Sequence, residues 1–265
     1  MRRVTSCIRV LLLLCAFTSH PGLAAFERGS GAVFISGSSL FGPLVPALPS
    51  RRILLAGLSP GLFGISELAH ASVAYQEPLR FGTVTVSATR LGTSLYKEST
   101  VALSFIAPVA GNLYAGVALS YNGLTIEGYG SDGTFGIDAG CILPVTENLS
   151  LVAVVRNVNR PTIGSARDPL PQVITTALSF KPAQPLRLVF FLEKESDFPT
   201  AVGFGTEYTV AGKVTLGGGM NLTIPEYSAS IGLETGRLMF SYSLTVHPLL
   251  GPTHHASIAI DLSDL

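Results

Sequence analysis

The sequence has no tryptophan, little charge and few cysteines. Only 13% of its residues are charged, and its 17 basic and 17 acidic residues cancel without forming a basic stripe. A nucleic-acid-binding protein needs a concentrated basic surface, so the composition does not support that function. Cys7 and Cys15 lie among the first 25 residues, which leaves Cys141 alone beyond them. A secreted domain stapled by intramolecular disulfides is therefore excluded.

The first residues have the layout of a secretory signal peptide. Three arginines precede the apolar residues 10–17, and small residues follow at positions 22, 24 and 25. We expect cleavage after Ala24 or Ala25, so that residues 1–25 are removed during export. A lipoprotein would need a small residue before Cys15, where Leu14 stands, and we interpret Cys15 as an apolar residue of the leader.

Long hydrophobic runs are missing after residue 25. Gly, Pro, Ser, Thr or a charge interrupts every apolar stretch before it reaches the ~20 residues of a transmembrane helix. Even so, 47% of all residues are hydrophobic and the mean hydropathy is +0.47. A closed β-barrel is the other structure that satisfies its backbone polar groups inside a membrane. High hydropathy without a helical span therefore favours a barrel.

Apolar residues alternate with polar or small ones from about residue 68 onward, which is the period of a β-strand. Val84, Val86 and Ala88, for example, alternate with threonine and serine. We count about 13 strand candidates between residues 68 and 262. Short turns are expected at sequences such as 131–133 and 211–212.

A soluble β-sandwich also shows this alternation, so the pattern alone leaves both architectures open. The apolar face continues through nearly all strands, and the opposite face is rich in Gly, Ser and Thr with few charges. These features favour an all-β, antiparallel transmembrane β-barrel over residues 68–265. Without tryptophan, its interfacial aromatic residues would be Tyr and Phe.

Residues 26–67 differ from the rest because they are dense in Gly, Pro and Leu. Closely spaced prolines argue against a central strand there. We expect this segment to form a plug, a short helix inside the lumen, a lead-in or a first strand, for which residues 31–35 are a candidate. A partly inserted N-terminal segment is the arrangement we favour.

Four further departures from alternation predict irregular structure. Proline-bearing segments at 160–171, 198–199 and 248–252 predict longer loops. The apolar phase shifts by one between residues 119–121 and 124–126, which predicts a β-bulge at Asn122-Gly123.

A few charges stand on otherwise small or apolar strands. A lone basic residue facing lipid near the midplane costs ~2–4 kcal/mol, so we expect these side chains in the lumen or at the rims. They could line a solute path or pair with one another as lumen fillers, and we favour pairing. The residues are Asp138, Arg156, Glu193, Glu207 and Glu234.

No set of residues predicts catalysis, a metal or a cofactor. The histidines beyond residue 25 are His70, His247, His254 and His255, and no nucleophile motif accompanies them. His254 and His255 are adjacent and should point to opposite faces of a strand, so they do not easily share one metal. We therefore expect a protein that is not an enzyme.

Several short segments resemble outer-membrane proteins of the PorV/PorQ type, which are distant relatives of FadL barrels. The most distinctive is the run 247–255, which resembles the family's C-terminal loop through His247, Pro248, Gly251, Thr253 and His254. The other segments are residues 64–68, 75–79, 95–100, 128–131, 156–161 and 192–194. The family's Asn-Pro-Ala-Gly-Leu element is replaced here by residues 55–60.

The resemblance implies a FadL-like barrel of about 14 strands (12 to 14) in the outer membrane, in contact with the lipid of that membrane. Its PorV branch implies a non-enzymatic partner in protein secretion, which handles cargo proteins of type IX secretion through proline-bearing outer loops. The FadL relationship implies, as an alternative, a channel or transporter for a small hydrophobic ligand. Residues 37–64 would then be the candidate gate.

Overall fold

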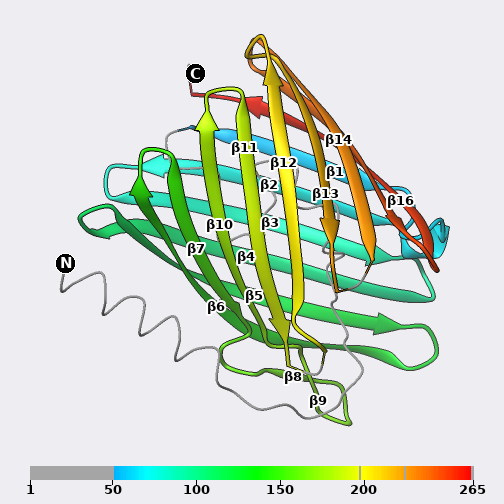
Figure 1. Ribbon diagram of the computed structural model, residues 1–265. Coiled ribbons are helices and arrows are strands. Elements are labelled where there is room, and N and C mark those ends of the chain that lie inside the picture. Colours follow the sequence, from blue (N-terminus) through cyan, green and yellow to red (C-terminus); the bar gives the residue numbers. More distant parts are fainter. Residues whose placement is uncertain (1–50, 197, 224, 264–265) are drawn as a thin grey trace.

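The computed structural model describes residues 51–196, 198–223 and 225–263. Within them, 14 antiparallel strands form one closed barrel (Figure 1). Successive strands are neighbours around the barrel, and β1 pairs with β16 to close it. The predicted architecture and strand number are therefore confirmed.

The first seven barrel strands are β1 (Ile53–Ser59), β2 (His70–Leu79), β3 (Gly82–Gly92), β4 (Tyr96–Ala110), β5 (Leu113–Ile126), β6 (Gly130–Thr146) and β7 (Leu149–Arg156). The other seven are β10 (Val173–Ala183), β11 (Leu186–Glu195), β12 (Ala201–Val210), β13 (Val214–Asn221), β14 (Glu226–Thr235), β15 (Leu238–His247) and β16 (Gly251–Asp261). A hairpin of β8 (Thr162–Ile163) and β9 (Asp168–Pro169) lies between β7 and β10, and the short helix η2 (Ser66–Leu68) lies between β1 and β2. No helix of the described residues is long and apolar enough to span a membrane.

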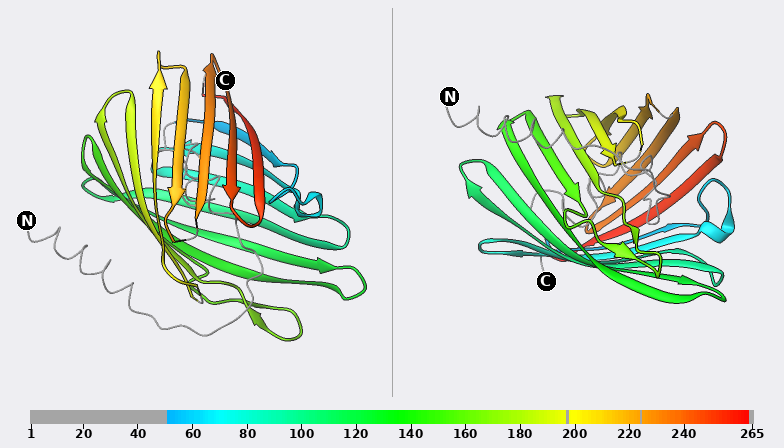
Figure 2. Two further views of the ribbon diagram at one scale, coloured as in Figure 1. Left: turned by 45° about the vertical axis from the view of Figure 1, so that its right-hand side comes forward. Right: turned by 90° about the horizontal axis from the view of Figure 1, so that it is seen from below.

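The strands on opposite sides of the barrel run in very different directions. In Figure 1, β2 to β6 cross the picture behind β10 to β13, which run from top to bottom. The two further views show the same continuous, twisted sheet curling back on itself (Figure 2). This is the arrangement that strand twist and tilt produce when a sheet closes.

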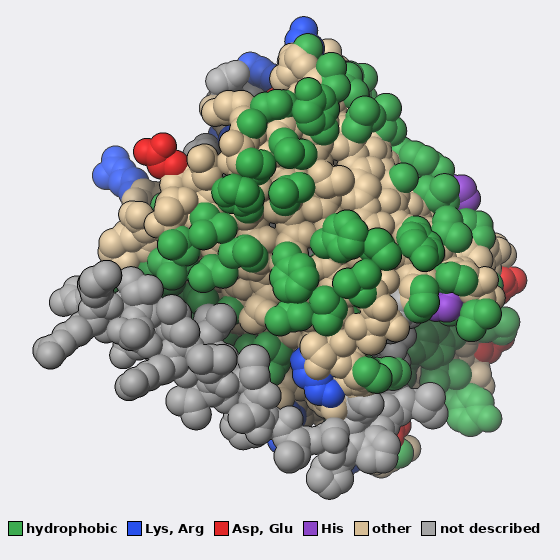
Figure 3. Space-filling view, in the orientation of Figure 1, with side chains coloured by type: hydrophobic (Ala, Val, Ile, Leu, Met, Phe, Trp, Pro, Cys, Tyr) green, Lys and Arg blue, Asp and Glu red, His purple; other side chains and the backbone are tan. Residues whose placement is uncertain are grey.

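The alternation in sequence becomes two faces of the sheet. On β5, Val117, Leu119 and Tyr121 are exposed on the outside, whereas Ala118 and Ser120 between them are buried on the inside. Figure 3 shows apolar side chains spread over one outer face, with most charged ones towards its margins. An outer face this apolar is typical of strands that contact lipid.

The two ends of the barrel have different connections. One end, here the short-turn end, has turns at residues 80–81, 111–112, 147–148, 184–185, 211–213 and 236–237. The other, the long-loop end, has connections at 60–69, 93–95, 127–129, 157–172, 196–200, 222–225 and 248–250. In outer-membrane barrels, the short turns are periplasmic and the longer loops are extracellular.

The barrel begins at Ile53 and not at residue 68. Strand β1 pairs with β2 and β16 over its length, so part of the proline-rich segment supplies the first strand. Its prolines flank this strand, at Pro49 and Pro60, and do not interrupt it. The strand candidate at residues 31–35 and the predicted signal peptide lie outside the described residues.

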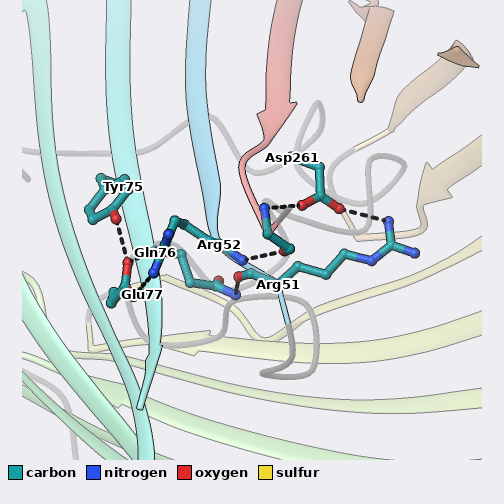
Figure 4. A network of polar contacts seen from close by, with 7 residues as sticks. Arg51, Arg52, Tyr75, Gln76, Glu77 and Asp261 are labelled. Carbon is teal, nitrogen blue, oxygen red and sulfur yellow. Dashed lines mark hydrogen bonds and ion pairs between the residues drawn. The ribbon is translucent and has the colours of Figure 1, made fainter. Parts of the chain in front are cut away.

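A polar network ties the strand ends where β1 closes the barrel (Figure 4). The guanidinium group of Arg52 lies 2.7 Å from the carboxylate of Glu77, which also accepts a hydrogen bond from Tyr75. On the other side, Leu262 N–H donates to the Arg52 carbonyl at 2.7 Å. The first strand is thereby fixed to β2 and to the end of β16.

Three local predictions differ from the structure. The register of β5 runs through Asn122 and Gly123 without a bulge, so the phase shift turns Leu124 and Ile126 inward. Residues 248–250 form a short turn and not a longer loop, because pairing between β15 and β16 continues to His247 and Gly251. Residues 131–133 belong to β6, and the expected turn lies at 127–129.

Candidate functional site: the barrel interior

Apolar side chains form a row across the inside of five adjacent strands. Strand pairing places them side by side, from β5 through β6, β7 and β10 to β11. We call them the inner apolar row: Tyr114, Ile142, Val152, Ala177 and Phe191. Each lies at an inward position, and all of them except the partly buried Tyr114 are buried.

More apolar side chains widen this row. Ile106, Ala118 and Val154 pack with Ile142 and Val152 in one buried cluster, against which Tyr114 also packs. The interior of this part of the barrel is thus apolar over several strands. Sequence alternation had predicted small and weakly polar residues there.

Phe191 ends the row beside a glycine. It pairs with Gly203 of β12, and a Cβ added at Gly203 would lie 2.2 Å from the Phe191 ring. From β12 onward the inward residues are mostly small or polar, with Gly205, Gly217 and Gly219 among them. The interior therefore has an apolar part and a small, polar part.

The sequence contains a signal for the apolar part. Residues 149–155 and 188–192 are apolar at almost every position and do not alternate. A continuous apolar run indicates a strand that is apolar on both faces. In a lipid-facing barrel, such runs place apolar groups inside as well as outside.

The five charges singled out from the sequence occupy inward positions. Arg156 lies 3.6 Å from Glu193 near the long-loop end, and Glu193 also accepts a hydrogen bond of 2.9 Å from Thr175. Arg187 lies 3.1 Å from Glu207 near the short-turn end. These pairs join neighbouring or next-neighbouring strands inside the barrel.

The other two charges are also held in place. Asp138 is 6% exposed, and its carboxylate accepts the Asn157 N–H at 2.8 Å where β7 ends. Glu234 lies 3.6 Å from Arg51 at the short-turn rim, and Arg51 is equally close to Asp261. The arrangement resembles paired interior groups more than a row of charges along one path.

The residues of the C-terminal loop motif lie around the β15–β16 turn. The His247 ring accepts backbone N–H groups from Leu249 and Leu250, and Thr253 accepts the Phe63 N–H at 2.8 Å. Pro248 is in the turn, and Gly251 begins β16 with a positive φ of 101°. The motif therefore shapes a turn and anchors the first loop.

The two adjacent histidines point to opposite sides of β16. His254 faces outward, with its Nδ1 2.7 Å from the Tyr242 hydroxyl. His255 faces inward, with its Nδ1 3.0 Å from the Ser59 hydroxyl. Across the described ranges, no group of three or more His, Cys, Asp or Glu side chains is placed to hold a metal ion.

The longest loop, residues 157–172, is fixed to β6. Asp132 accepts the Gly164 N–H at 2.7 Å, and the Asn159 side chain bonds the backbone of Phe135 and Ile137. Ile163 and Leu170 of the loop are each 3% exposed. The predicted loop at 160–171 is present, and it has a defined structure at the long-loop end.

No protein-family model and no curated protein matches the sequence. Solved structures do match. The toluene transporter TodX of Pseudomonas putida has a TM-score of 0.58 at 9% identity, over 89% of this chain and 93% of that chain. For the CymD monoaromatic hydrocarbon channel the TM-score is 0.56 at 10% identity, over 91% and 95%. For Omp33 of Acinetobacter baumannii it is 0.52 at 11% identity, over 80% and 98%.

At such low identities, these likenesses establish the fold. The chain has the closed antiparallel barrel of outer-membrane proteins and resembles the FadL-type barrels TodX and CymD. The narrower resemblance to PorV/PorQ proteins has no matching family model behind it.

Proposed function

We propose that this protein is an outer-membrane channel for small hydrophobic molecules. The inner apolar row carries the proposal, because it places apolar side chains of five strands on the inside of a barrel that is also apolar outside. A water-filled porin has a polar interior, which gives a hydrophobic solute no favourable surface. The similar structures TodX and CymD are described as a toluene transporter and a monoaromatic hydrocarbon channel.

The chemistry of the interior supports transfer of an apolar solute. Ligand sites for small molecules are mostly apolar, with a few placed polar groups. The paired charges Arg156–Glu193 and Arg187–Glu207 lie towards the two ends of the barrel, while Ile142, Val152 and Val154 lie between those ends. Neutralised charges near the ends leave the middle free of isolated charge.

A matched pair of double variants on β7 tests the proposal. Val152→Thr with Val154→Thr adds two hydroxyls at inward positions, whereas Ala153→Ser with Val155→Thr adds two at outward positions of the same strand. An unpaired hydroxyl in an apolar site costs about 0.5–2 kcal/mol, so the inward variant should slow uptake roughly tenfold. The measurement is the uptake rate of labelled toluene into proteoliposomes that contain the refolded protein.

The outward variant is the control for folding and reconstitution. Its uptake rate should stay within about twofold of the unaltered protein, since the solute would not pass the lipid-facing side chains. Equal rates for both double variants and the unaltered protein would contradict an apolar path along β7.

A second candidate function is that of a partner in protein secretion, as the PorV resemblance implies. The structured loop 157–172 favours it, because side-chain contacts from β6 hold the loop at the long-loop end as a preformed surface. Exported cargo proteins would contact this loop, and the protein would need no path for a solute.

Shortening the loop separates the two functions. Replacing residues 162–169 by a Gly-Ser linker should abolish the display of exported cargo on the cell surface and leave toluene uptake unchanged if the protein acts in secretion. Normal display of cargo in cells that lack the protein altogether would rule this function out. Surface display is measured by labelling cargo on intact cells.

A further inference from the structure

Two basic residues face outward near the long-loop end of neighbouring strands. Arg90 of β3 is paired with Ser99 of β4, and Lys97 of β4 is paired with Gly92 of β3. Both have the phase of the exposed Val86, Val101 and Leu103 on these strands, so they point out of the barrel. As diagonal neighbours across the strand pair, they lie about 7–8 Å apart at their backbones.

Neither residue is in an ion pair with any residue of the described ranges. The five ion pairs involve Arg51, Arg52, Arg156 and Arg187. Glu98, next to Lys97 in sequence, points inward and is 7% exposed, where Tyr96 donates a hydrogen bond to it. Glu127, just beyond the end of β5, forms no ion pair with either residue. The two positive charges therefore stand uncompensated on the outer face.

On the β5 side of this pair, the outward positions in register with Arg90 and Ser99 carry no side chain, whereas on the other side β2 places Ala71 in register with Arg90. Gly123 of β5 and Gly133 of β6 continue the register row of Arg90 and Ser99. The Tyr121 ring lies over Gly133, where an added Cβ would come within 2.2 Å of its hydroxyl. This row therefore carries Arg90 and two glycines, and the Tyr121 ring covers the glycine of β6.

The next row towards the barrel middle carries aromatic side chains. Tyr121 and Phe135 are 46% and 59% exposed, and their ring centroids lie 5.3 Å apart. Tyrosine and other aromatic residues are typical of the membrane–water interface. Arg90 lies one register row beyond this pair and Lys97 two rows beyond it, so both lie near the ends of their strands at the long-loop end.

We propose that Arg90 and Lys97 form a binding site for the phosphate of a phosphorylated glycolipid in the outer leaflet. The inference rests on the outer-membrane location of the proposed function, in which the long-loop end faces the cell exterior. Two basic side chains at head-group level attract anionic lipid, and the aromatic pair contacts its acyl chains.

The test compares Arg90→Gln with Lys97→Gln against Arg167→Gln with Lys213→Gln. Both double variants remove two positive charges, but Arg167 lies in the β8–β9 loop and Lys213 in a turn at the other end. Native mass spectrometry of the full-length protein in detergent gives the dissociation constants for lipid A, dephosphorylated lipid A and inorganic phosphate. We expect lipid A to bind the first variant at least tenfold more weakly and the second within about twofold of the unaltered protein.

Three outcomes would overturn the proposal. The first is that lipid A and dephosphorylated lipid A bind with equal dissociation constants. The second is that both double variants lose the same affinity for lipid A. The third is that inorganic phosphate binds as tightly as lipid A, which would indicate a site for free anions. Heat-modifiable gel mobility and toluene uptake are measured on the same preparations. A protein that does not form a heat-modifiable barrel contradicts the membrane location, whereas an intact barrel without phosphate dependence contradicts the lipid site alone.

Discussion

Position 203 requires glycine because the Phe191 ring packs closely against the backbone there. The Phe191 ring occupies the space where a Cβ would stand, and the Met220 carbonyl oxygen lies 2.8 Å from that point as well. Gly205, two residues later on the same face, has only a backbone oxygen at 3.5 Å. The two glycines share a strand and a face but differ in their surroundings.

Gly203→Ala should destabilise the barrel by about 1–3 kcal/mol, because Phe191 or the β13 backbone must move to accommodate the methyl group. Gly205→Ala should have little effect. The measurement is the temperature at which each refolded variant loses its compact gel form. Equal midpoints for both variants would contradict the packing of Phe191 on Gly203.

The Arg187–Glu207 pair is the shortest of the ion pairs that the interior charges singled out from the sequence form with described residues. Arg187 also donates to Ser179 at 3.1 Å, whereas Oε1 of Glu207 has no hydrogen-bond partner among the described residues. The sequence predicted that these charges lie inside or at the rims. It could not predict the partners, because those depend on which strands are neighbours and in which register.

Arg187→Met should lower stability by roughly 1–3 kcal/mol, because it leaves a poorly solvated carboxylate without its nearest cation. Adding Glu207→Gln to this variant should recover part of the loss. Midpoints of thermal unfolding for the two single variants and the double variant form the cycle that isolates the coupling. Strictly additive losses would show that the two side chains do not interact.

Strand β1 is the element that sequence reasoning placed least well. The prolines around it dominated the composition of residues 26–67, although the seven residues from Ile53 to Ser59 contain none. Their alternation is short, and only pairing with β16 identifies them as the closing strand. Closure of a barrel joins elements far apart in sequence, which local patterns do not report.

Ala56→Pro should prevent closure, because Ala56 pairs with Val73 on one side and Ile258 on the other, and proline is not accommodated within a central strand. Ala56→Val is the matched control, since the side chain is outward and β-branched residues suit strands. We expect the proline variant to lose the compact, heat-modifiable form and the valine variant to keep it. A compact proline variant would show that β1 is dispensable for the barrel.

For the molecule as a whole, composition and alternation were sufficient to predict a closed barrel, and the family resemblance added the strand number of about 14. The interior was predicted less well. The small, polar face expected throughout holds for β12 to β14, whereas β5 to β11 carry the inner apolar row. Alternation describes each strand separately, and the row becomes visible only when strand register brings the inward residues of five strands together.

The most direct test of this account is the gel mobility of the purified protein refolded in detergent, run with and without boiling. The account predicts a β-rich species by far-UV circular dichroism that migrates as a compact form and changes mobility on boiling. A protein that stays monomeric and β-rich without detergent, with the same mobility before and after boiling, would contradict the membrane barrel and leave a soluble β-structure in its place.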